Sequence, residues 1–118
     1  MPKMALKLTF GKSNRPTRSY EEVVTKYQTK LASDKIVTTP PFEPDRIAFA
    51  QRDDLNTKLM SKVDQLNSLL DRFSEEDLEY YVIPHPLLGK LTVREMAYFT
   101  IYHVGHHLNN SKQNLAAI

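Results

Sequence analysis

Apolar residues recur every three or four positions in three stretches of the chain, which is the spacing of an amphipathic helix. The first stretch covers about residues 20–32 and begins with the capping-box spacing of Ser19 and Glu22. The side expected to pack against the core holds three apolar residues, Val24, Tyr27 and Leu31. The pattern therefore predicts a helix near the start of the chain.

The second and longest stretch runs from Ile47 to Phe73, and Asp45 stands where a residue can cap its start. Its apolar residues keep the helical spacing across roughly seven turns, with polar residues on the other side. We expect this helix to bury one stripe and to carry no chemistry.

The third stretch extends from Thr92 to Asn114. Thr92 and Glu95 form another capping box at its start. A short helix or turn over residues 74–81 and a loop over residues 82–89 are expected to precede it.

Two segments lack helical spacing. Residues 1–18 contain Gly11 and Pro16 among scattered charges, which predicts an extended arm. Residues 33–44 carry three prolines and predict a linker between helices. With 118 residues the chain can bury one core, so we expect a single domain over residues 1–118 of the all-α class, with about three helices and an N-terminal arm.

Composition narrows the classes of function. There is no cysteine, so a metal site must use nitrogen and oxygen ligands. A net charge of +2 is mild for a nucleic-acid binder, and we expect no nucleic-acid partner. No apolar run reaches the ~20 residues of a membrane span or forms a secretory signal, which predicts a cytoplasmic protein with no membrane association. The basic residues near the start are interpreted as a solvated face or tail: Lys12, Arg15, Arg18, Lys26 and Lys30.

Three of the four histidines lie on the last predicted helix. His103 and His107 are four residues apart, so a helix places both imidazoles on one face, close enough to share a divalent metal ion. Both align with the apolar face through Met96 and are expected to point inward. A helical histidine pair is also common without any metal, but the concentration of imidazoles on an apolar helix favours a site.

Other ligands remain open. His106 could pair with His103 in place of His107, and His85, held in an extended loop by two flanking prolines, could ligate or could brace the last helix. Val104 stands where a zinc peptidase of the HExxH type has its glutamate, so peptidase chemistry is disfavoured.

Gly105 lies between the histidines and costs the helix about 1 kcal/mol relative to alanine. Close approach of another helix or of a ligand would explain it, and so would simple drift. Four tyrosines could place a phenol near the site, although tyrosines at helical spacing usually pack: Tyr80, Tyr81, Tyr98 and Tyr102.

The pattern HPLLGKLTxREMxYFxxYHxxHH, from His85 to His107, resembles the C-terminal half of DinB-like (YfiT-like) proteins. The resemblance is specific over about Asp77 to Leu108. It implies an up-and-down helical bundle with a divalent metal ion, zinc or nickel, on three histidines. Two of them come from the last helix and match His103 and His107, and the first comes from an early helix.

The chain has no histidine before His85, so we expect a bundle without that early helix. The third ligand would then come from His85, His106, water or another chain, or the sequence is a truncated form. Exposed helix faces would favour a homodimer.

The resemblance implies a metal-dependent thiol S-transferase acting with a low-molecular-weight thiol, or a related hydrolase. No residue can be assigned as a catalytic acid or base. The alternative is a non-catalytic helical scaffold or stress-related interaction module with a vestigial metal site.

Overall fold

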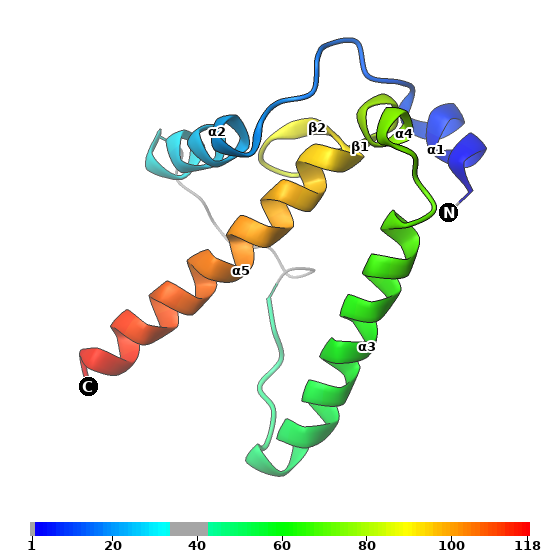
Figure 1. Cartoon of the computed structure of the whole chain (residues 1–118). Helices are drawn as coiled ribbons and strands as arrows, with labels where there is room; N and C mark the ends of the chain where they lie inside the picture. The colour runs from blue at the N-terminus through cyan, green and yellow to red at the C-terminus, as the bar shows by residue number, and fades with distance from the viewer. Residues whose placement is uncertain (1, 34–42) are drawn as a thin grey trace. The chain divides into compact units, whose positions relative to one another are not determined.

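A computed structural model describes residues 2–33 and 43–118 (Figure 1). Contacts group them into two compact units, one formed by residues 2–33 with Glu75–Ile118 and one by residues 43–74. Most of these residues are helical, and one two-stranded antiparallel sheet accompanies the helices. The all-α prediction is therefore confirmed.

In the first unit, helix α2 (Tyr20–Ser33) packs against helix α5 (Val93–Ala116) (Figure 1). The Ser19 hydroxyl accepts a hydrogen bond from the Glu22 backbone N–H at 3.2 Å, so the predicted capping box forms. On α2 the most deeply buried residue is Val23 rather than the expected Val24. The buried core joins five residues: Val23, Tyr27, Leu88, Leu91 and Phe99.

The start of α5 is capped as predicted. The Thr92 hydroxyl accepts from the Glu95 backbone N–H at 3.1 Å, and the Glu95 carboxylate accepts from the Thr92 backbone N–H at 2.7 Å. Both residues are fully buried. These reciprocal bonds satisfy donors that a helix start leaves without partners.

The expected loop over residues 82–89 is instead part of a β-hairpin. Strand β1 (Val82–His85) pairs with strand β2 (Gly89–Thr92) in antiparallel register. Buried Val82 and Leu91 anchor the two strands, and pairing supplies partners for backbone groups that a buried loop would leave unsatisfied. Gly89 has a φ of 74°, which explains the glycine in the turn. Helix α4 (Glu75–Tyr80) precedes the hairpin, in agreement with the short helix expected there.

The prediction of an extended arm over residues 1–18 was wrong for its first part, because helix α1 covers Lys3–Phe10. So short a helix is marginal alone, and contacts elsewhere in the fold stabilise it. Leu6 is buried, and the Lys3 ammonium pairs with the carboxylate of Asp77. After Gly11 the chain is irregular up to α2, and Lys12 forms a β-bridge with Tyr81.

The second unit contains a 3₁₀ turn, η2 (Phe49–Gln51), followed by helix α3 (Arg52–Leu70). The long predicted helix therefore starts after Asp45, and capping by Asp45 was wrong. The Gln51 side chain accepts instead from the Ala48 backbone N–H at 3.0 Å. Burial of one stripe of this helix stays a prediction, as does the single domain over residues 1–118.

The linker predicted over residues 33–44 falls mostly outside the described residues. Ser33 itself is the last residue of α2, so this residue is helical rather than part of a linker.

Candidate metal centre

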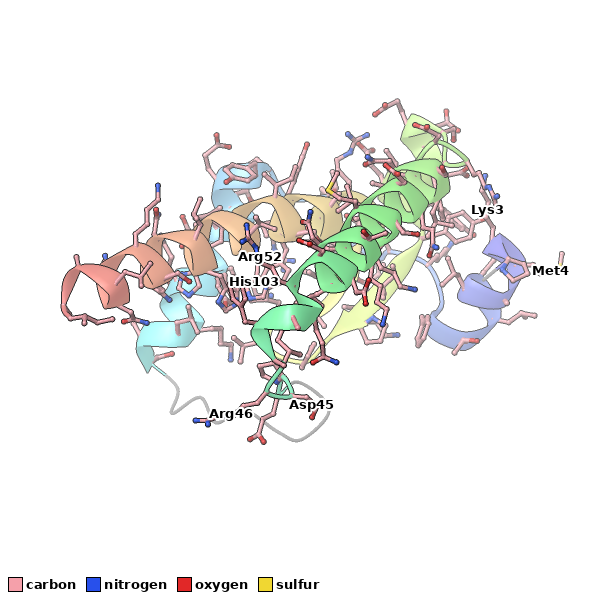
Figure 2. All side chains as sticks on the ribbon, turned by 90° about the horizontal axis from the view of Figure 1, so that it is seen from below. Lys3, Met4, Asp45, Arg46, Arg52 and His103 are labelled. Atoms are coloured by element: carbon pink, nitrogen blue, oxygen red, sulfur yellow. The ribbon has the colours of Figure 1, made fainter. Side chains whose placement is uncertain are left out.

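The centre of α5 is held by stacked rings. The His103 imidazole stacks on Phe99 with ring centroids 4.9 Å apart and an interplanar angle of 23°. The Tyr27 ring of α2 meets Phe99 edge-on at 5.0 Å and His103 at 6.1 Å. His103 is half-buried, and Figure 2 labels its side chain on α5. These contacts favour the orientation in which the imidazole lies flat against Phe99.

The His103 and His107 imidazoles converge. Their Nε2 atoms are 2.9 Å apart, and their ring centroids are 4.3 Å apart. At imidazole nitrogen–metal distances of about 2.0–2.1 Å, two ligands on one ion lie roughly 3.3 Å apart in a tetrahedral shell and roughly 2.9 Å apart in neighbouring positions of an octahedral shell. The pair therefore fits two positions around a divalent ion. In the absence of an ion the same distance is a hydrogen bond, in which one imidazole donates to the other.

The protonation of His103 suits ligation. Burial lowers its pKa, and positive charge on His107 and on His106 lowers it further. The imidazole is therefore neutral at neutral pH, which a metal ion requires of a histidine ligand.

The expectation that both imidazoles point inward was wrong for His107, which is exposed. Within its unit, the hairpin and α2 pack against the first half of α5, whereas the helix is exposed from His107 onward. The pair thus has one half-buried member and one member open to solvent.

His106 turns to other partners. Its ring lies 6.4 Å from the His103 ring, farther than the His107 ring does. Its Nε2 is 3.3 Å from the amide nitrogen of Asn110, which can donate to it. His106 also lines a separate cleft of about 220 Å³ that includes Tyr20 and Tyr102. The geometry brings His103 and His107 together and leaves His106 on a neighbouring face.

His85 is engaged by its own turn. Its Nδ1 accepts hydrogen bonds from the backbone N–H groups of Leu87 at 3.0 Å and Leu88 at 3.1 Å. Among residues 2–33 and 43–118, no three side chains of the His, Cys, Asp or Glu type come close enough to hold a metal ion. The structure therefore offers two ligands and does not add His85 as a third.

Gly105 is not explained by a close neighbour. A methyl group built on its Cα would meet no atom within 4 Å in the part of the chain that the structure describes. Close approach of another helix is thus not seen there.

Sequence reasoning missed the partner of the basic residues. Glu95 is fully buried and accepts two hydrogen bonds from the Arg15 guanidinium, each 2.8 Å long, and one from the Arg18 backbone N–H at 2.8 Å. Burial alone would raise the pKa of Glu95, but the bonds from Arg15, Thr92 and Arg18 outweigh it and lower the pKa to about 2. The residues interpreted as a solvated tail therefore include two that pair with a buried carboxylate.

The fold and the site define a mainly helical protein with an imidazole pair on its last helix. The family model of the DinB superfamily matches residues 7–110, a range that contains all four histidines. The chain belongs to the DinB superfamily. No curated protein and no solved structure matches it. In the described ranges, no helix combines the length and apolar character needed to cross a membrane.

Proposed function

We propose that His103 and His107 form half of a divalent metal site, with zinc or nickel as the ion. The observation that carries the proposal is the 2.9 Å separation of their Nε2 atoms. Membership of the superfamily supports it, because DinB proteins generally bind metal. The neutral state of His103 supports it as well.

The remaining coordination positions must be filled from outside the described residues. A second copy of the chain can contribute a ligand, and solvent can fill another position. Within the first unit, the later part of α5 carries exposed apolar side chains at Val104, Leu108 and Leu115, which favours association through this helix. We therefore propose a homodimer whose interface lies next to the histidine pair.

The proposed activity is transfer of a low-molecular-weight thiol to an electrophile, or a related hydrolysis. A bound divalent ion supplies a positive charge that lowers the pKa of a thiol and favours its thiolate form. His103 is held by Phe99 and Tyr27 and fixes the position of the site. The exposure of His107 leaves the site accessible to a substrate.

The test follows consumption of a small thiol in the presence of an electrophile and zinc or nickel. Wild-type protein is compared with His103→Ala and with His106→Ala as the matched control. The proposal predicts metal-dependent turnover that His103→Ala abolishes and His106→Ala leaves within about twofold. Equal rates for all three proteins would contradict it.

A non-catalytic scaffold is the second candidate, and it is favoured by the absence of a three-residue metal group among the described residues. It predicts a protein that takes up no metal and still associates. Sizing of wild type and His103→Ala, each with and without metal, separates the two: metal-dependent association lost in the variant supports the site, and association indifferent to both supports the scaffold.

A further inference from the structure

The tautomer of His85 is fixed by the turn that follows it. Nδ1 accepts two backbone hydrogen bonds, from Leu87 and Leu88. A charged imidazole has protons on both nitrogens and cannot accept, so His85 is neutral, and its single ring proton is on Nε2. Burial lowers the pKa of His85, and the electrostatic interaction with His103 lowers it further, in agreement with the neutral form.

The Nε2–H of His85 is an unused donor. Within residues 2–33 and 43–118 it has no hydrogen-bond partner, and the half-buried ring leaves it available to a bound molecule. The ring lies against Phe99 with centroids 4.4 Å apart, and Phe99 also stacks on His103. An N–H donor without a partner therefore lies in the same aromatic cluster as the histidine pair.

We propose that His85 is a binding residue that donates a hydrogen bond from Nε2–H to the molecule occupying the His103–His107 site. This inference rests on the proposed function, because it requires an occupant at the pair. It assigns His85 to the substrate rather than to the metal ion. The preferred occupant is electron-rich, such as a thiolate, because an N–H group binds a charged acceptor about twice as strongly as a neutral one.

The matched variant is His85→Asn. The asparagine side-chain oxygen accepts from the backbone N–H two residues later, as the Nδ1 of His85 does, so the turn before β2 is preserved. Asparagine cannot place a donor where Nε2 lies. The variant separates the turn-forming role of His85 from the proposed binding role.

The experiment titrates the protein with cobalt ion alone and then adds mercaptoethanol, following the absorption of the cobalt. We expect His85→Asn to bind cobalt within about twofold of wild type and to bind the thiol roughly tenfold more weakly. Loss of cobalt binding, as in His103→Ala, would overturn the inference and make His85 a ligand. Unchanged thiol affinity would overturn it and leave His85 as a turn residue.

A measurement without any variant covers the case in which His85→Asn does not fold. Nitrogen NMR of the zinc-loaded wild type should show a protonated Nε2 and a bare Nδ1 at His85, and the Nε2–H signal should move when mercaptoethanol is added. A protonated Nδ1, or an Nε2–H signal that stays in place, would contradict the inference. A wild-type protein that binds neither cobalt nor zinc would contradict the proposed metal site, and the proposal for His85, which rests on that site, would fall with it.

Discussion

The polar side chains in the first turn of α5 have many hydrogen-bond partners, whereas those in the middle of the same helix have few. At Glu95 the carboxylate is 0% exposed, and Arg15, Arg18 and Thr92 all donate to it. His103 and His107 lie eight and twelve residues after Glu95. Their imidazoles contact each other through their Nε2 atoms, and His103 also stacks on Phe99. One helix thus carries a saturated polar cluster and an unsaturated one.

We interpret the Glu95 cluster as a contribution to stability and the histidine pair as a binding site. A buried carboxylate needs every hydrogen bond it has, because an unpaired buried charge is costly. An imidazole pair that binds a ligand must instead keep ring nitrogens that other protein groups do not occupy. The Glu95 cluster ties the segment before α2 to the start of α5 and so supports the packing of Tyr27 against His103.

The largest effect is expected from Glu95→Gln. Removing the charge leaves the Arg15 guanidinium without its carboxylate, and breaking a buried pair in this way costs about 3–5 kcal/mol. Urea unfolding followed by circular dichroism measures the loss. Glu21→Gln on the exposed face of α2 is the control, with an expected change of no more than about 1 kcal/mol. Similar losses of stability in Glu95→Gln and Glu21→Gln would show that the Glu95 cluster does not hold α2 against α5.

Acid should weaken the same cluster. The pKa of Glu95 is about 2 in the folded protein and 4.5 ordinarily, so its contribution to stability is present above about pH 4.5 and is lost as the pH falls toward 2. The difference in unfolding free energy between wild type and Glu95→Gln should narrow across this interval. A difference that stays constant down to pH 2 would contradict the assignment.

The two histidines should differ in their effect on stability. His103→Ala removes ring contacts with Phe99 and Tyr27 and should cost about 1–1.5 kcal/mol. His107→Ala changes an exposed side chain and should stay within about 0.5 kcal/mol of wild type. Urea unfolding of the metal-free variants gives both values, and equal losses would remove the distinction between the half-buried and the open member of the pair.

A gain in stability is expected at Gly105. Because a methyl group there meets no atom within 4 Å, Gly105→Ala should stabilise the protein by about 1 kcal/mol through helix propensity alone. Thermal unfolding measures the gain. A destabilised variant would indicate that a neighbour approaches Gly105 more closely than the described residues show.

Local signals explain which parts of the fold could be predicted. The helices α2 and α5 and their caps follow from residues within one or two turns of each other, and so does the His103–His107 spacing. The bond from Arg15 to Glu95 joins residues 80 positions apart, and neither helical spacing nor charge clustering indicates such a pair. The helix α1 is likewise stabilised by contacts from distant segments. The β1–β2 hairpin is local in sequence, but its prolines suggested a loop.

In the candidate site, too, one part could be predicted from local sequence spacing and another could not. The pairing of His103 with His107 could be proposed from sequence because both are on one helix. The role of His85 could not, because it depends on which ring nitrogen the turn at Leu87 and Leu88 engages.

The most direct test of the central claim is the metal content of protein purified without an affinity tag. Elemental analysis should find zinc or nickel in wild type and in His106→Ala. It should find almost none in His103→Ala or His107→Ala, although all four proteins remain folded. Metal-free wild type that also fails to take up added zinc or nickel, or metal content that survives both substitutions, would contradict the claim that His103 and His107 form a metal site.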